Sequence, residues 1–345
     1  MSRRGWVLFA IMCVVWGIPY LLIKVAVGGV SVPMVVFGRT ALGALVLLPL
    51  ALRSGQFRAL RPVWAWLVAF AALEMIVPWG LLSSAERQLP SSLAGLLIAA
   101  VPIIGVVIAR LTGGTERLSL RRWAGLLVGL GGVAVLAAPH LTGGHGWPVA
   151  EVLLVAVGYA TAPLIAARKL ADVPALPMTT ACLALAALVY TPAAILTWPH
   201  HLPSGSVLAS LAALGVICTA CAFIVFLQLI REAGPSRAMV FTYINPAVAV
   251  AAGVLLLGEP FTVTIAAAFV LILTGCVLAT GGRGRSARGG GSSGPDGRSG
   301  LDGRSGSGGR SGSGDQPDQD SHQRQAATAP PATSTDPDRA SAQTG

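Results

Sequence analysis

The chain has 345 residues, of which 54% are hydrophobic and 11% are charged, and its formal net charge is +10. Because soluble domains carry about 25% charged residues, this composition argues against a soluble protein and predicts one embedded in a lipid bilayer. The basic residues lie in short segments between apolar runs and not along one polar face, so no nucleic-acid partner is expected.

Ten apolar segments follow one another along the chain. Each approaches the length of about 20 residues that a helix needs to cross a hydrocarbon core of about 30 Å. Long apolar runs without alternation favour helices over a β-barrel, so we expect an all-α integral membrane protein with ten transmembrane helices. The predicted helices cover residues 6–27, 31–52, 63–83, 90–112, 121–139, 148–168, 176–198, 205–230, 236–257 and 261–281.

The first segment follows a basic start, as in a signal peptide, but it exceeds 20 residues and further spans follow, so we expect it to be retained. If the N-terminus lies inside, the outer loops contain only Lys24 and Arg87. The positive-inside rule then predicts a multi-pass membrane protein with both termini in the cytoplasm. The inner loops would contain Arg3, Arg4, Arg53, Arg58, Arg61, Arg110, Arg117, Arg121, Arg122, Arg168, Lys169, Arg231 and Arg237.

The stretch 91–119 returns as the stretch 235–262. Each copy runs from a serine through a proline ten residues later to a Gly-x-Glu (first copy) or Gly-Glu (second copy) sequence. The first copy ends among arginines, whereas the second has none. The matched residues include Ser92 with Ser236, Pro102 with Pro246, Gly132 with Gly275, and Trp16 with Tyr159.

Five spans in each copy is an odd number, so the second copy must enter the membrane inverted, which places its matching loop on the outer side and explains the missing arginines. Two inverted five-helix repeats are typical of secondary transporters that work by alternating access. We predict repeats at residues 1–139 and 140–281. Residues 282–345, rich in Gly, Ser, Arg, Asp and Pro, are predicted to form a disordered cytoplasmic tail.

Four stretches carry a family resemblance: "WGIPYLLIK", "FGRTALGALVL", "SLAGLLIAAVPIIGVVIA" and "ERLSLRRWAGLLVGLGGV". With the two copies of a five-helix unit, they make residues 6–281 resemble the EamA-type drug/metabolite transporters. The resemblance implies ten spans, a bacterial plasma-membrane location, and export or import of small metabolites without ATP.

Two charged residues lie clearly in the interior of the predicted spans, away from their ends: Arg39 in the second and Glu74 in the third. An arginine or an acidic residue at a helix centre costs about 2.5–3.5 kcal/mol on insertion scales. Both lie at the same depth, so we expect them to pair or to line one water-filled cavity. Glu74 would take up and release a proton during transport. The alternative is a buried strut that locks the second span to the third.

Trp16, Tyr20 and Lys24 follow one another at helical spacing, so a continuous helix would present them on one stripe. Pro102 and Pro246 sit mid-span, where a proline frees backbone groups that need partners. We expect a substrate site between these helices. Its candidate residues are Trp16, Tyr20, Arg39, Glu74, Tyr243 and Asn245. Interhelix packing by the aromatic residues, snorkelling by Lys24 and a proline hinge without ligand contacts are the alternatives.

Gly125 and Gly129 are spaced G-x-x-x-G and are followed by Gly132, a pattern that lets another helix approach closely. We expect packing within the bundle, with a homodimer as the alternative. The five cysteines lie in apolar runs, which does not favour disulfides, and Cys218 and Cys221 lack further metal ligands. No metal or cofactor is expected.

The spans contain no histidine and no paired carboxylates, and no Gly-rich phosphate-binding loop occurs, so neither an enzyme nor an ATP-driven pump is predicted. We expect a secondary transporter that exports small organic metabolites across the bilayer. Arg39 favours a substrate carboxylate, which makes amino acids and related compounds the leading class. A flippase for a lipid-linked carrier and a non-transporting membrane partner protein are the alternatives.

Overall fold

The computed structural model describes residues 2–111, 119–142, 146–234 and 239–280, and within these ranges it contains helices and no strand. The predicted tail, residues 282–345, lies outside the described residues. The first half contains α1 (Arg3–Val15), α2 (Pro19–Val27), α3 (Val32–Ser54), η1 (Gln56–Val63), α4 (Trp64–Ala71), η2 (Ala72–Ile76), α5 (Val77–Ala85), α6 (Ser91–Ile98), α7 (Val101–Leu111) and α8 (Leu120–Thr142). The second half contains α9 (Gly146–Lys169), α10 (Ala175–Leu196), α11 (Gly205–Ala212), η3 (Ala213–Cys221), α12 (Ala222–Ala233), η4 (Met239–Tyr243), α14 (Asn245–Leu257) and α15 (Val263–Thr280).

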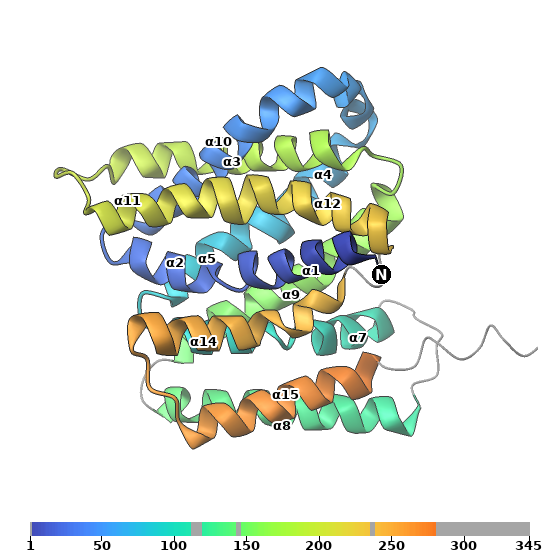
Figure 1. Ribbon diagram of the computed structural model, residues 1–345, viewed down its shortest axis with the longest axis vertical. Helices are drawn as coiled ribbons and strands as arrows, with labels where there is room; N and C mark the ends of the chain where they lie inside the picture. The colour runs from blue at the N-terminus through green and yellow to red at the C-terminus, as the bar shows by residue number, and fades with distance from the viewer. Residues whose placement is uncertain (1, 112–118, 143–145, 235–238, 281–345) are drawn as a thin grey trace, which may run out of the picture. The chain divides into compact units, whose positions relative to one another are not determined.

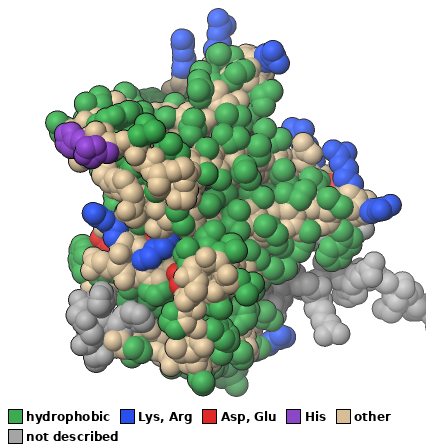
Figure 2. Space-filling view, turned by 60° about the vertical axis from the view of Figure 1, so that its left-hand side comes forward, with side chains coloured by type: hydrophobic (Ala, Val, Ile, Leu, Met, Phe, Trp, Pro, Cys, Tyr) green, Lys and Arg blue, Asp and Glu red, His purple; other side chains and the backbone are tan. Residues whose placement is uncertain are grey.

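Several of these helices run on from one another and form membrane-length spans. Among the described residues, 8 spans are long and apolar enough to cross a bilayer, and Phe241–Leu257 and Val263–Leu278 are shorter apolar helices. Figure 2 shows hydrophobic side chains over most of one face, with Lys and Arg mainly at its edges. This distribution fits helices that face lipid, and the all-α membrane fold predicted from the sequence is confirmed.

Local signals set the ends of the spans. Ser31 caps α3 by accepting a hydrogen bond from the backbone N–H of Met34 at 3.3 Å. Pro33 follows in the first turn, where its missing N–H costs nothing. The helix stops at Gly55, which has a φ of 67°, a left-handed conformation that favours glycine. Gly258, with a φ of 65°, ends α14 in the same way.

The last helices of the two halves, α8 and α15, lie side by side (Figure 1). A Cβ atom built on Gly132 would lie 2.8 Å from Leu271 Cβ, and one built on Gly275 would lie 2.7 Å from the carbonyl oxygen of Gly125. Residue numbers therefore rise along α8 as they fall along α15, and the two helices are antiparallel. This is the relation that an inverted repeat requires of matched helices.

The predicted glycine pattern therefore packs helices within the bundle. A Cβ atom on Gly129 would collide with Ile103 of α7, and one on Gly275 would collide with the backbone of Gly129. In contrast, a Cβ atom on Gly131 would meet nothing within 4 Å. The two backbones approach this closely because neither has a side chain at the crossing point.

A contact between the halves closes the end of the bundle that contains Glu86 and Glu259, which we call the acidic end. The Glu259 carboxylate accepts hydrogen bonds from the backbone N–H groups of Ser91 (2.7 Å) and Ser92 (2.9 Å) and from the Ser91 hydroxyl (2.9 Å). These N–H groups belong to the first turn of α6, which has no intrahelical acceptors for them. A residue of the second repeat thus caps a helix of the first.

We expect Glu259→Gln to destabilise the protein at neutral pH by about 1 kcal/mol, the typical cost of a weakened helix cap. Burial would raise the pKa of Glu259, but the hydrogen bonds from Ser92 and Ser91 outweigh it and lower that pKa. The carboxylate therefore stabilises the fold fully above the ordinary glutamate pKa, and this contribution is lost as the pH falls through the lowered value. Thermal unfolding measured from about pH 3 to 7 should show the two proteins converging at the acid end. Equal stability at neutral pH would contradict the capping role.

Candidate functional site

Both predicted prolines stand at interruptions of their spans. The turn at Ala99 and Ala100 separates α6 from α7, and Pro102 is the second residue of α7. In the second repeat, a short 3-10 helix, η4, precedes α14, whose second residue is Pro246. Helix ends therefore meet in the middle of the fourth span and of its counterpart, and their backbone groups need partners from neighbouring segments.

The first span is also interrupted, between the end of α1 at Val15 and the start of α2 at Pro19. The prediction that Trp16, Tyr20 and Lys24 share one stripe of a continuous helix is therefore wrong. The indole N–H of Trp16 donates to the carbonyl oxygen of Cys218 at 3.2 Å. The ring packs against three phenylalanines at centroid distances of 5.1 to 5.7 Å, namely Phe223, Phe226 and Phe241.

Asn245 supports this interruption from the second repeat. In the side-chain orientation that suits both the amide oxygen and the amide nitrogen, the nitrogen donates to the carbonyl oxygens of Cys13 (3.2 Å) and Phe241 (3.1 Å). Tyr243 packs against a different core cluster, the one that Tyr20 and Tyr159 also contact. Trp16 and Asn245 therefore hold backbone segments in place, whereas Tyr20 and Tyr243 pack against another core cluster than Trp16 does.

A second pair of irregular segments lies in the third span of each repeat. Both η2 and η3 are π-helices, in which the hydrogen bonds span one residue more than in an α-helix. The offset of 144 residues that matches Pro102 to Pro246 places η2 within η3. η2 contains Glu74 and η3 contains Thr219. Because π-helical turns recur at functional sites, this symmetric pair marks the centre of the bundle as a site.

Arg39 joins the two repeats at this centre. Its Nε–H donates to the Thr219 hydroxyl at 3.0 Å, and its guanidinium carbon lies 3.7 Å from the centroid of the Trp79 ring. The Thr219 hydroxyl itself donates to Leu214 O at 2.8 Å, which leaves its lone pairs for the arginine. Arg39 is only 8% exposed, so its charge is stabilised by an aromatic face and one hydroxyl and not by bulk water.

The terminal nitrogens of Arg39 make no hydrogen bond to any residue that the structure describes. These nitrogens are not completely buried, so a small ligand can reach them. A guanidinium has five N–H donors, and its planar edge suits a carboxylate that accepts two of them at once. The arrangement leaves this edge available for a ligand.

Glu74 does not form the predicted ion pair with Arg39. Within the described ranges no ion pair joins the two side chains, and Glu74 Oε2 is buried without a hydrogen-bond partner. Glu74 lies within electrostatic range of Tyr159 and Cys182, and so faces α9 and α10, whereas Arg39 turns towards η3 and Trp79. Arg39 and Glu74 lie at equal depth along their spans, which favours an ion pair, but their side chains point to different neighbours.

Two tyrosines interact electrostatically with Arg39, and one of them also with Glu74. Tyr20 packs on Gly95, where a Cβ atom would lie 3.3 Å from the tyrosine ring, so the glycine makes room for it. Tyr20 lies within electrostatic range of Arg39 and Tyr159, and Tyr159 within range of both Arg39 and Glu74. We call the group formed by Tyr20, Arg39, Trp79, Tyr159 and Thr219 the central cluster.

Lys24 lies at the acidic end and is half-buried. Its ammonium donates to the carbonyl oxygens of Glu86 (2.6 Å) and Leu89 (2.8 Å), in the turn that follows α5. The side chain therefore has a structural role at the end of the span, whether or not it also snorkels. Lys24 fastens the end of α2 to the end of the third span.

Sequence reasoning missed two buried carboxyl groups. Glu86 is 0% exposed, and neither of its carboxylate oxygens has a hydrogen-bond partner in the part of the chain that the structure describes. Glu151 is 5% exposed and accepts one hydrogen bond, from the Ser84 hydroxyl at 3.0 Å. Both residues lie near span ends, where the sequence suggests solvent. Trp79 and Thr219 were missed because an apolar span gives no sign of which aromatic or hydroxyl side chain meets the arginine.

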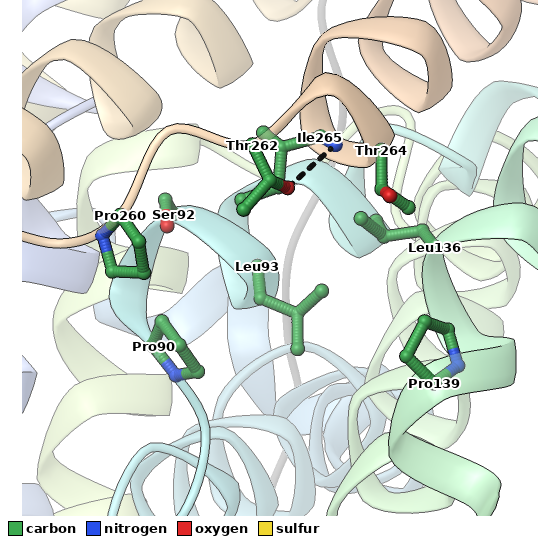
Figure 3. Close-up of a pocket in the computed structure, with 9 residues that line it drawn as sticks. All are labelled: Pro90, Ser92, Leu93, Leu136, Pro139, Pro260, Thr262, Thr264 and Ile265. Carbon is green, nitrogen blue, oxygen red and sulfur yellow. Dashed lines mark hydrogen bonds between the residues drawn. The ribbon is translucent and has the colours of Figure 1, made fainter.

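A cavity of about 280 Å³ lies elsewhere, beside the acidic end (Figure 3). It is mainly apolar, and in it the Thr262 hydroxyl accepts a hydrogen bond from the backbone N–H of Ile265 at 3.2 Å. It contains none of the predicted substrate residues. Its lining consists of Pro90, Ser92, Leu93, Leu136, Pro139, Pro260, Thr262, Thr264 and Ile265.

Comparison with known proteins agrees with this architecture. The model of the EamA-like transporter family matches the chain twice, at residues 3–138 and 147–281. The inner membrane transporter YedA of Escherichia coli strain K12 is 30% identical over 284 residues, which cover 80% of this chain and 90% of YedA. The transporter YvbV of Bacillus subtilis strain 168 is 25% identical over 294 residues, which cover 83% of this chain and 95% of YvbV.

The fold is also known from a solved structure. A crystal structure with a TM-score of 0.58 and 23% sequence identity covers 81% of this chain and 98% of its own chain. At this identity, the likeness concerns the fold alone.

Proposed function

This chain belongs to the EamA-like transporter family, and from that premise we propose that it is a secondary transporter that exports small organic metabolites across the plasma membrane. The halves, residues 1–139 and 140–281, would move against each other and expose a central site to each side in turn. We place both termini in the cytoplasm on the basis of the charged loops. Amino acids and related carboxylates are the proposed substrates.

The observation that carries this proposal is Arg39. A buried guanidinium whose terminal N–H groups have no acceptor in the described part of the chain favours an anionic partner, because a largely desolvated charge gains most from an opposite charge. A substrate carboxylate meets that requirement through two parallel hydrogen bonds. The rings of Tyr20, Trp79 and Tyr159 supply aromatic faces for the organic part of the substrate.

The helix interruptions support alternating access. Each repeat contributes one matched span broken at a proline and one π-helical segment; α6 packs against α14, and Arg39 donates to Thr219 of η3. Irregular backbone of this kind can absorb a change in helix direction without loss of a whole ladder of hydrogen bonds.

The test is a comparison of cells that overproduce the full chain with cells that produce the Arg39→Lys variant at equal membrane levels. We expect the wild-type chain to raise extracellular amino acids or related carboxylates and to protect against toxic amino-acid analogues, and the variant to do neither. Equal extracellular metabolites and equal sensitivity in both strains would overturn the export function.

We expect Glu74→Gln to uncouple transport from the pH gradient. Glu74 has a buried carboxylate oxygen without a partner in the described residues, so a proton is the ligand that removes the cost of its charge. Glutamine keeps the shape but cannot release a proton. In proteoliposomes, substrate flux should depend on the imposed pH gradient for the wild-type protein and should not for the variant. Retained coupling in the variant would remove Glu74 from the mechanism.

A further inference from the structure

The Glu86 carboxyl group is enclosed at the acidic end without any hydrogen-bond partner among the described residues. It follows the last residue of α5, is 0% exposed, and both of its oxygens are buried. A carboxylate that loses its water and gains no donor is destabilised by several kcal/mol, on the order of 2–7 for a polar group and more for a charge. Enclosure therefore favours the protonated form of Glu86.

The charged and titratable groups around Glu86 come from every side. α2 contributes Lys24 and Tyr20, α3 contributes Arg39, α9 contributes Tyr159, and the segment between α14 and α15 contributes Glu259. Burial raises the pKa of Glu86 well above its ordinary value, and Glu259 acts in the same direction. Lys24 and Arg39 oppose this shift without cancelling it.

Among these neighbours, Lys24 has two possible sets of hydrogen-bond acceptors: backbone carbonyls and the Glu86 carboxylate. Its ammonium interacts electrostatically with the Glu86 carboxyl but donates its hydrogen bonds to the backbone carbonyls of Glu86 and Leu89. These bonds hold α2 against the turn after α5. An ionised carboxylate at Glu86 would attract the ammonium more strongly than a carbonyl does, because charge-assisted hydrogen bonds are about twice as strong as neutral ones.

We propose that Glu86 is a proton-binding residue of the transport cycle at the acidic end, with Lys24 as the partner of its ionised form. Glu86 takes a proton from water when that end is open and keeps it when the end closes. On opening, its O–H bond breaks, the proton returns to water, and Lys24 moves from the two carbonyls to the carboxylate. The bonds between α2 and residues 86–89 are thereby released.

This inference rests on the proposed function, since it assigns a step in that transport cycle. Glu74 and Glu86 are 12 residues apart on one span, about 18 Å at the helical rise. Two carboxyl groups at different depths can serve as separate proton stations, one central and one at the acidic end.

The test does not require a known substrate. Hydrogen–deuterium exchange of the purified full chain in nanodiscs, corrected for the intrinsic effect of pH, measures opening of the backbone at residues 86–93. We expect exchange there to rise several-fold between about pH 6 and pH 9 in the wild-type protein. Glu86→Gln, which mimics the protonated group, should keep exchange low throughout, and Lys24→Met should keep it high throughout. Glu151→Gln removes another buried carboxyl and should respond as the wild type does.

Thermal unfolding gives a second readout. A carboxyl whose pKa is raised in the folded state contributes stability that is complete below the unfolded pKa and is lost as the pH rises through the folded pKa. Wild-type stability should therefore fall with rising pH by more than that of Glu86→Gln, and the variant should be the more stable protein at the alkaline end. An identical pH response in both proteins, in exchange and in unfolding, would overturn the proposal.

The two proposals can fail separately. If no transported metabolite is found but the pH-dependent opening disappears in Glu86→Gln, then the export function falls and the proton site stands. If Glu74-dependent transport is observed but the acidic end opens alike in the wild-type protein and in Glu86→Gln, then only the role of Glu86 falls.

Discussion

Gly275→Ala is expected to destabilise the protein by about 1–3 kcal/mol or more, the cost of overpacking a well-packed contact. The new methyl group would collide with the backbone of Gly129 and lie 2.7 Å from the carbonyl oxygen of Gly125. Backbone atoms cannot rotate away as a side chain can, so α8 and α15 would have to separate. Thermal unfolding of the purified protein in detergent measures the effect.

Gly131→Ala is the matched control, because the same change on α8 meets nothing within 4 Å. We expect it to leave stability unchanged or to raise it by up to about 1 kcal/mol, since alanine favours a helix more than glycine does. Unfolding of Gly275→Ala at the wild-type temperature would contradict the close packing of α8 on α15. Light scattering on both variants separates packing within the bundle from dimer formation, the alternative that the glycine spacing left open.

Arg39→Lys is expected to lower transport at limiting substrate by about 10-fold to 100-fold, equivalent to the loss of about 1.5–3 kcal/mol of charge-assisted hydrogen bonding. Lysine keeps the positive charge but cannot stack its plane on Trp79, donate an Nε–H to Thr219 and offer a two-pronged edge to a carboxylate at the same time. Initial rates in proteoliposomes measure the effect.

Thr219→Val isolates one part of this arrangement. It removes the hydroxyl that accepts from Arg39 at 3.0 Å and leaves the guanidinium in place. We expect it to impair transport less than Arg39→Lys, because the edge available to the substrate remains. Wild-type transport by Arg39→Lys would show that the guanidinium is a strut between helices and not a substrate ligand.

The spans and their interruptions at Pro102 and Pro246 could be predicted because each depends on a local property. Apolar length indicates a crossing, and proline lacks the N–H that a continuous helix needs. The π-helical segments could not, since "ALEMI" and "ALGVICTAC" contain no residue that is incompatible with an α-helix. Their geometry depends on neighbours, such as Arg39 on Thr219 and the hydroxyl of Tyr190, which donates to Ile76 O at 2.8 Å.

The candidate site was predictable only in part: Tyr20 and Arg39 of the central cluster were expected, whereas Trp79, Tyr159 and Thr219 were not. The depth of Arg39 and Glu74 follows from counting residues, whereas the direction of the Glu74 side chain around its helix depends on the π-helical turn. Glu86 was missed for a different reason. It precedes Arg87 at the end of a span and looks like a solvated loop residue, and only the contacts of α2 with the turn after α5 enclose it.

The two π-helical segments make the third span of each repeat one residue longer than a regular helix of the same rise would be. The wider π-helical turn absorbs this extra residue, so removal of a single residue from Ala72–Ile76 would restore α-helical winding while the flanking parts of the span keep their facing. Glu74 or its neighbours inside the segment would then change the partners they face on α9 and α10. Shortening the chain by one residue thus alters the site and spares the rest of the span, and the same holds at Ala213–Cys221, where Thr219 would lose its register with Arg39.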